Sequence, residues 1–230
     1  MQFFKHLFPA AKPQGPALRQ EMTLKEKFDY IYKHKLWGEG PSGPGSYGGI
    51  GSSYIRFLKV FLERYEIKSI TDVGCGDFNI GRQLAPLVEK YYALDISSRA
   101  IDIARQNHSE FANVTFAVAD ACTDPVPAAD LVTVRQVLQH LTNQQIEMAL
   151  KSIERSGSKY ALVSEHCYLP EKVEQPNIDL PHTSLAVRAF QRSGVFINEP
   201  PFSRSAQLVK AIPMENPTER LCFFFWEIQP

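Results

Sequence analysis

Hydrophobic residues recur at two different spacings along the chain, and the change from one spacing to the other predicts the elements. Apolar positions at helical intervals predict a helix over about 23–35, which begins at a capping-box signature formed by Thr23 and Glu26. A second apolar stripe predicts a helix that includes residues 54–65. From residue 69 onward, short strand-like runs alternate with helical segments. Strands are predicted at 69–73, 91–96, 114–119, 131–134 and 160–164, and helices at 79–88, 97–107 and 142–153.

This alternation predicts an α/β fold with a doubly wound, mainly parallel sheet. Right-handed crossovers place the carboxyl ends of parallel strands along one edge of the sheet, where we expect the ligand to bind. The pattern stops after the fifth strand. Residues 167–205 are rich in proline and are predicted to contain a short helix at 183–191. Two final strands, at 207–212 and 221–228, are predicted to close the sheet as an antiparallel hairpin.

The pattern divides the 230 residues into three parts. Residues 1–22 are predicted to form a mobile N-terminal arm, and residues 23–66 to supply N-terminal helices and a glycine-rich loop that covers the site. Residues 67–230 form the core, with 167–205 as an insertion on the substrate side. The loop at 38–53 holds seven of the 13 glycines. A flexible linker is the alternative interpretation of that segment.

Composition narrows the function classes. The 25 basic and 25 acidic residues leave no formal net charge, which does not favour tight binding to a nucleic acid. The four cysteines are scattered, so the sequence indicates neither a zinc site nor a disulfide framework. No apolar run is long enough to span a bilayer, and we expect a cytoplasmic protein that does not bind membranes.

A glycine-containing turn follows the first predicted strand of the sheet. Its sequence, Asp72-Val73-Gly74-Cys75-Gly76-Asp77, allows a sharp turn and is expected to bring peptide N–H groups close to a ligand. A dinucleotide site needs glycine at the third position of G-x-G-x-x-G, where this chain has Asn79. The residue type therefore argues against an NAD-type cofactor. Asp95 and Asp120 follow the next two strands.

The Asp-Val-Gly-Cys-Gly-Asp run resembles motif I of the class I S-adenosylmethionine (SAM)-dependent methyltransferases. The resemblance implies a Rossmann-like sheet of seven strands, with SAM as the cofactor. Further runs at 42–46, 135–141 and 156–162 resemble a bacterial, uncharacterised branch of the family that acts on small molecules.

The resemblance also implies roles for individual residues. Asp72 would orient the ammonium group of the cofactor, Asp95 would accept hydrogen bonds from both ribose hydroxyls, and Asp120 would bind the adenine amino group. Ile96 would pack on the adenine ring, and Ala121 would offer it a backbone N–H. The remaining cofactor-binding candidates are Gly74, Cys75, Gly76, Trp37, Ser42, Ser46, Arg135 and Gln136.

The residues after the fourth and fifth strands are candidates for catalysis. The Asn/Asp-Pro-Pro step of the nucleic-acid amino-methylating branches is missing after residue 134. Metal-dependent members of the resembled family carry a carboxylate at the end of this strand, whereas Asp130 stands at its beginning, so the resemblance predicts no metal. His140 is a candidate general base because imidazole titrates near neutral pH, and the alternative is a packing or capping role. Glu165 and His166 are also candidates for removing a proton, unless they are ordinary polar residues at the rim.

The predicted reaction is transfer of a methyl group to an oxygen or nitrogen of a small or medium acceptor, with a sugar or secondary metabolite suggested by analogy alone. Two alternatives stay open. One is an NAD-type oxidoreductase on a similar sheet, and the other is a non-catalytic module that binds SAM or a partner.

Overall fold

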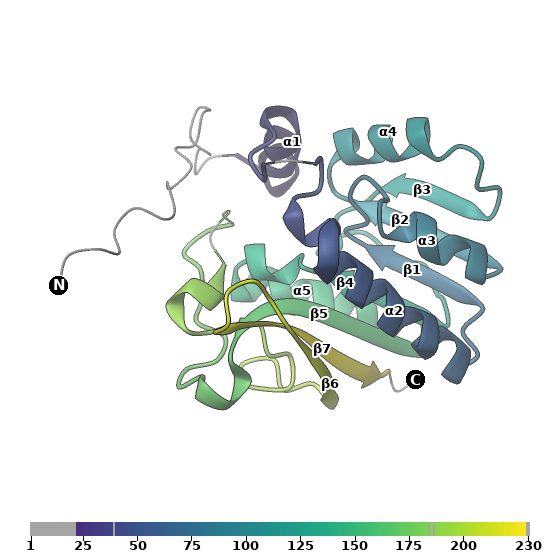
Figure 1. Cartoon of the computed structure of the whole chain (residues 1–230). Helices are drawn as coiled ribbons and strands as arrows, with labels where there is room; N and C mark the ends of the chain where they lie inside the picture. The colour runs from purple at the N-terminus through teal and green to yellow at the C-terminus, as the bar shows by residue number, and fades with distance from the viewer. Residues whose placement is uncertain (1–21, 39, 184, 186, 229–230) are drawn as a thin grey trace.

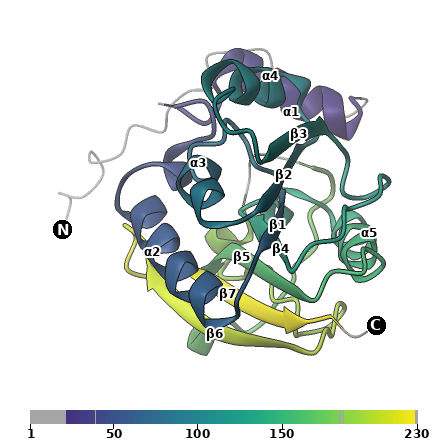
Figure 2. The ribbon, with the colours of Figure 1, turned by 90° about the vertical axis from the view of Figure 1, so that its right-hand side faces the viewer.

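The computed structural model describes residues 22–38, 40–183, 185 and 187–228, so the predicted N-terminal arm lies almost entirely outside the described residues. The centre of the molecule is a seven-stranded sheet in the order β3-β2-β1-β4-β5-β7-β6 (Figures 1 and 2). The first five strands pair in parallel and the last two are antiparallel, which confirms the predicted fold class. The strands are β1 (Ser69–Val73), β2 (Lys90–Asp95), β3 (Val114–Val118), β4 (Leu131–Arg135), β5 (Tyr160–Tyr168), β6 (Ala206–Pro213) and β7 (Glu219–Glu227).

Helices cover both faces of this sheet, as Figure 2 shows. One hydrophobic core packs α2 (Gly48–Arg64), α3 (Gly81–Leu84) and α4 (Ser98–Asn107) against one face. A second core packs α1 (Leu24–His34) and α5 (Asn143–Glu154) against the other. The predicted capping boxes at the starts of α1 and α5 are both present, and each supplies partners for backbone N–H groups that a helix start leaves unpaired.

Strand β5 is four residues longer than its apolar pattern predicts. The reason is its neighbour, because β7 pairs with it along the whole stretch from Tyr160 to Tyr168. Glu165 and His166 therefore lie inside a strand rather than in a loop after it. Since successive side chains of a strand point to opposite faces, these two neighbours face different surroundings.

Three predicted helical segments differ from the structure. The helix predicted at 79–88 is a single α-turn, α3, followed by a 3₁₀ turn at Ala85–Leu87, because Pro86 cannot donate a helical hydrogen bond. The helix α2 begins at Gly48, so the end of the glycine-rich segment is helical. The segment at 183–191 forms only the 3₁₀ turn Arg188–Gln191 among its described residues.

Candidate functional site

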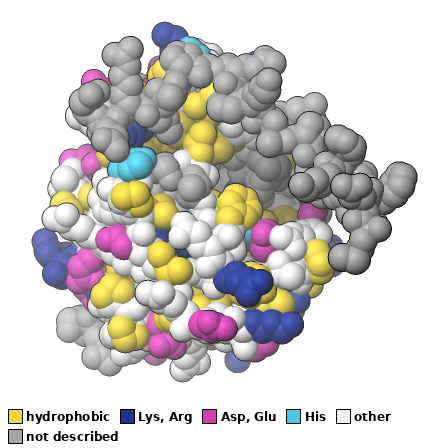
Figure 3. Space-filling view, turned by 90° about the vertical axis from the view of Figure 1, so that its left-hand side faces the viewer, with side chains coloured by type: hydrophobic (Ala, Val, Ile, Leu, Met, Phe, Trp, Pro, Cys, Tyr) yellow, Lys and Arg dark blue, Asp and Glu magenta, His cyan; other side chains and the backbone are white. Residues whose placement is uncertain are grey.

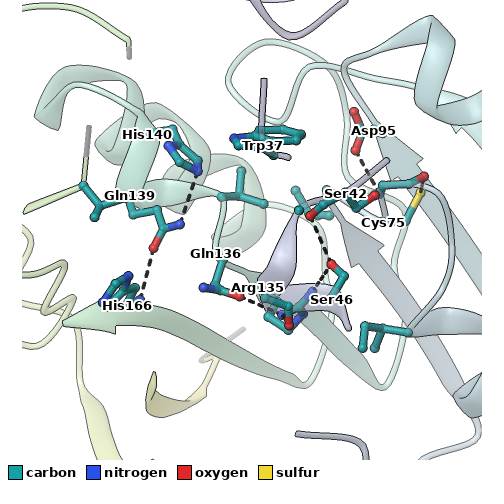
Figure 4. A pocket seen from close by; sticks show the side chains of 18 of the residues that line it. Trp37, Ser42, Ser46, Cys75, Asp95, Arg135, Gln136, Gln139, His140 and His166 are labelled. Carbon is teal, nitrogen blue, oxygen red and sulfur yellow. Dashed lines mark hydrogen bonds between the residues drawn. The ribbon is translucent and has the colours of Figure 1, made fainter. Parts of the chain in front are cut away.

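A cavity of about 1180 Å³ lies at the carboxyl ends of the parallel strands. The close view in Figure 4 shows polar side chains from several elements that point into it, and Figure 3 shows hydrophobic side chains exposed on the face at the left of Figure 1. The cavity is larger than most small-molecule sites, and it has room for a cofactor together with a second ligand. Its lining includes every cofactor-binding candidate, namely Trp37, Ser42, Ser46, Asp72, Gly74, Cys75, Gly76, Asp95, Ile96, Asp120, Ala121, Arg135 and Gln136.

The turn after β1 differs in one respect from what its sequence predicts. Gly74 and Gly76 both adopt positive φ angles, +79° and +60°. The N–H groups of Gly74 and Cys75 donate to the Leu94 carbonyl at 2.8 and 2.9 Å, and that of Gly76 donates to Asp95 at 3.0 Å. The prediction that these N–H groups face a ligand is therefore wrong. They fasten the turn to β2, and the donors that a pyrophosphate would need at this turn are already used.

Two buried carboxylates stand beside the turn. Asp72 accepts hydrogen bonds from Tyr91 Oη at 2.9 Å and Thr133 Oγ1 at 2.8 Å. Asp95 accepts from the N–H of Gly76 and, at 2.8 Å, from that of Ser97. Burial raises the pKa of both groups, that of Asp95 to about 6. Each carboxylate oxygen retains lone pairs for a further donor, because a carboxylate has about four acceptor positions.

The third acidic residue of this end of the cavity lies after β3. Asp120 Oδ1 accepts from the N–H of Cys122 at 2.9 Å, and this contact stabilises the turn after β3. Asp120 also lines the cavity. Ile96 and Ala121 line the cavity with it. The carboxyl ends of β1, β2 and β3 thus place three acidic side chains around one end of the cavity, which suits a ligand with positive charge and several donors.

The glycine-rich loop is docked over this end. Ser42 Oγ donates to Asp77 Oδ1 and accepts from the Asp77 N–H, both at 2.8 Å, and Tyr47 Oη also donates to the Asp77 carboxylate. The half-buried guanidinium of Arg135, at the end of β4, donates to the Gly45 carbonyl at 2.9 Å and to Ser46 Oγ at 2.6 Å. These contacts hold residues 42–47 against the turn after β1, which favours a site-forming loop over a linker.

Asn79 is also explained by this docking. Its Nδ2 donates to the Ser46 carbonyl at 2.6 Å. The residue that stands where a dinucleotide site has its third glycine therefore fastens the loop.

At the opposite end of the cavity, Gln139 connects the two histidine candidates (Figure 4). Its Oε1 accepts from the backbone N–H of His166 at 3.2 Å, and this contact fixes the orientation of the amide. Its Nε2 then donates to Nε2 of His140, 3.2 Å away. The His140 ring lies beside the Trp37 ring, with 6.0 Å between the centroids.

Glu165 does not reach the cavity. It is fully buried and accepts from the N–H groups of Val137, Leu138 and Gln139 at 3.2, 2.9 and 3.1 Å. Burial raises the pKa of Glu165 to about 7, against the lowering effect of these donors. The proposed proton-accepting role of Glu165 is contradicted by this position, since no substrate atom in the cavity can touch it. Its carboxylate supports the 3₁₀ turn Leu138–His140 instead.

The other end of the same turn is held by a buried arginine that the sequence did not point to. The Arg188 guanidinium donates to the carbonyls of Gln139 at 3.1 Å and Leu141 at 2.8 Å. Glu165 and Arg188 therefore bind the N–H and carbonyl groups of one short turn, and together they fix the direction of Gln139 and His140.

His166, unlike Glu165, lines the cavity. Its Nε2 lies 2.7 Å from Glu219 Oε2, and Glu219 Oε1 accepts from Asn216 Nδ2 at 2.7 Å. Sequence reasoning missed Glu219 and Asn216, which are at least fifty residues further along the chain than His166. Only the β5–β7 register could have revealed them, because it pairs Tyr168 with Glu219 and so places Glu219 diagonally across from His166.

Residues 70–157, the segment that contains the glycine turn, the three acidic residues and His140, match the family model of the methyltransferase domain. This segment is therefore similar to methyltransferase domains.

Solved structures support the fold across most of the chain. The N-methyltransferase NodS from Bradyrhizobium japonicum, in complex with S-adenosylhomocysteine, has a TM-score of 0.59 at 14% identity, over 85% of this chain and 97% of NodS. A SAM-dependent methyltransferase from Clostridium acetobutylicum has a TM-score of 0.57 at 13% identity, over 78% and 92%. A structure from work on the conversion of a disulfide bond into a thioacetal group during echinomycin biosynthesis has a TM-score of 0.56 at 20% identity, over 90% and 94%.

No helix within the described ranges is long and apolar enough to cross a membrane. In the same part of the chain, no group of three or more His, Cys, Asp or Glu side chains is arranged to hold a metal ion.

Proposed function

We propose that the protein transfers a methyl group from SAM to an oxygen or nitrogen atom of a small or medium acceptor. The observation that carries the proposal is the division of one cavity into two ends. Three acidic side chains surround one end, and histidine and glutamine side chains stand at the other. A two-ligand reaction needs such an arrangement, because it must hold a cofactor and an acceptor next to each other.

The chain's residues fit SAM. The carboxylates of Asp72, Asp95 and Asp120 suit the ammonium, ribose and adenine donors, and together they favour the positive charge of the cofactor. The glycine at 74 is also required by close packing, since a Cβ there would overlap a methyl group of Val137. When bound, SAM supplies a methyl group on a sulfonium. The chain's part is to orient this group and to keep water away.

The same contacts oppose the dinucleotide alternative. A pyrophosphate needs free N–H donors at the glycine turn and positive charge nearby. Here the N–H groups of Gly74, Cys75 and Gly76 are bonded within the protein, and the carboxylates of Asp72 and Asp95 line the cavity beside them.

The lining of the acceptor end supports an acceptor without phosphate or carboxylate groups. Among the described residues that line the cavity, Arg135 is the one Lys or Arg, and its guanidinium is bonded to the glycine-rich loop. The cavity lining also includes the apolar side chains of Leu185, Val187, Phe190 and Met214, and the Phe190 ring lies against the His166 ring. We propose that residues 42–47 cover the cofactor and that the insertion at 167–205 covers the acceptor. Nucleic acids, which carry a phosphate on each residue, fit this lining poorly.

Calorimetric titration of the full chain with SAM, S-adenosylhomocysteine and NADH tests the proposal. We expect saturable binding of SAM and S-adenosylhomocysteine, and none of NADH. A folded chain that binds neither SAM nor S-adenosylhomocysteine would overturn the assignment, and binding of NADH alone would restore the oxidoreductase alternative.

A further inference from the structure

We propose that His166 is the proton acceptor for a hydroxyl group of the acceptor substrate, and that Glu219 and Asn216 position its ring for this role. The inference rests on the proposed function and extends it by naming the base, the residues that orient it and the chemical class of the acceptor.

The first support is the pairing of His166 with Glu219. Their side chains are 10% and 9% exposed, so the 2.7 Å contact between Nε2 and the carboxylate is shielded from water. A carboxylate only accepts hydrogen bonds, so Nε2 must carry the proton of this contact. In the neutral ring, the lone pair then lies on Nδ1.

The second support is the surroundings of Nδ1. Within the described part of the chain, Nδ1 of His166 makes no hydrogen bond. It is also absent from the buried polar atoms that lack a partner, so Nδ1 is not fully buried. Because the residue lines the cavity, Nδ1 is accessible from it. A basic nitrogen with an oriented ring and an open lone pair is what a general base requires.

His140 is less suited to this task. The amide of Gln139 donates to its Nε2, so the lone pair at that nitrogen is already in use. The ring is also packed between Phe28 and Trp37, with centroid distances of 6.4 and 6.0 Å. These contacts indicate a packing role for His140 in the cavity lining, and His166 is therefore the better candidate for the base.

The third support is an aromatic side chain at the mouth of the acceptor end. Phe190 lines the cavity, is 72% exposed and lies edge-on to the His166 ring at 6.1 Å. An aromatic side chain at a cavity mouth offers a large apolar contact surface to a ligand. Leu185, Val187 and Met214 line the same cavity, and with Phe190 they suit an acceptor that has an apolar or aromatic body and an uncharged hydroxyl.

The transfer step balances with these residues. Nδ1 of His166 takes the hydroxyl proton while the oxygen forms its bond to the methyl carbon. The electron pair of the breaking carbon–sulfur bond stays on sulfur, which loses its positive charge. The imidazolium that results is stabilised by the Glu219 carboxylate, in the way that a buried carboxylate orients and stabilises histidine in hydrolytic triads.

Asn216 makes the proposal testable without an acceptor. Its Oδ1 accepts from the N–H and Oγ1 of Thr218, at 3.0 and 2.8 Å, so its Nδ2 must donate to residue 219. In Glu219→Gln, the amide oxygen would face Asn216 and the amide NH₂ would face His166. The NH₂ group would donate to Nε2, and the proton of the neutral ring would move to Nδ1.

We would therefore record long-range ¹H–¹⁵N spectra of the ¹⁵N-histidine-labelled full chain at alkaline pH, with the His166 signal assigned from His166→Gln. We expect the Nε2–H tautomer in the wild type and the Nδ1–H tautomer in Glu219→Gln. The matched control is Glu215→Gln, which removes one carboxylate from the exposed turn that precedes β7 and is expected to keep the wild-type tautomer. An Nδ1–H tautomer in the wild type, or no change in Glu219→Gln, would overturn the proposal.

The functional measurement uses methyl-labelled SAM with a panel of uncharged phenols and alcohols and their phosphate esters. We expect transfer to an unphosphorylated member, and a decrease in kcat of about 100-fold in Glu219→Gln and His166→Gln with an unchanged KM for SAM.

Calorimetric titration with SAM separates a failure of the proposed function from a failure of the role of His166. Loss of SAM binding in the wild type contradicts the proposed function, whereas normal SAM binding with an unchanged kcat in both variants contradicts the role of His166 alone. If a variant unfolds, shown by its circular dichroism melt, Asn216→Ala replaces it, and we expect that variant to lose the fixed ring orientation.

Discussion

The replacement Asp95→Asn tests the cofactor end most directly, because it changes the chemistry of one buried group and almost none of its shape. Asp95 accepts from the N–H groups of Gly76 and Ser97 and is proposed to accept from two ribose hydroxyls. Asparagine can accept at one oxygen only, and its NH₂ group meets a backbone N–H with no acceptor between them. A hydrogen bond to a charged group contributes about 1.5–3 kcal/mol. Loss of one such bond weakens SAM binding about 10- to 100-fold.

The pH dependence gives a second, independent signature. Burial raises the pKa of Asp95 to about 6, so the carboxylate that is proposed to bind the ribose is ionised above this pH and protonated below it. If only the ionised form binds well, affinity for SAM falls as pH falls through 6, by about tenfold at pH 5. Asp95→Asn cannot titrate, so its affinity should stay flat over the same range.

Calorimetric titration with SAM between pH 5 and 8 measures both effects. The control is Asp102→Asn, which removes a charge from the exposed side of α4 and is expected to retain the wild-type pH profile. Unchanged affinity in Asp95→Asn, or a pH profile that persists in this variant, would refute the assignment of Asp95 to the ribose.

The remaining predictions concern the turns that hold the site. Gly74→Ala combines a positive φ with overlap against Val137, so we expect a loss of stability of about 1–3 kcal/mol in a denaturant melt, together with weaker SAM binding. Gly49→Ala, in open space in α2, should instead be neutral or stabilise by about 0.5–1 kcal/mol, and an equal loss in both variants would contradict this explanation. Arg188→Ala leaves buried carbonyls unpaired and should cost at least about 3 kcal/mol, whereas the exposed Arg56→Ala should change stability by less than about 0.5 kcal/mol.

The fold class, and the gathering of the cofactor-binding candidates around one cavity, were predictable from the sequence alone. Hydrophobic periodicity and capping boxes are local signals, and they located the strands and the long helices to within a few residues. The motif around Gly74, with Asp95 and Asp120 at the ends of the next two strands, was informative for a simple reason. Parallel strands bring their carboxyl ends to one edge, so residues in equivalent sequence positions meet in space.

The acceptor end depended on tertiary structure. Glu165 and His166 are adjacent polar residues in the sequence, but successive side chains of a strand point to opposite faces. The Glu165 carboxylate is therefore buried against a 3₁₀ turn, whereas His166 lines the cavity. The partner of His166 comes from β7, and the antiparallel register alone places Glu219 beside it. The N–H groups of the glycine turn are bonded to β2, which no local pattern reveals. Local patterns specify elements, whereas the direction of a side chain and the partner of a buried polar group depend on register and packing between distant segments.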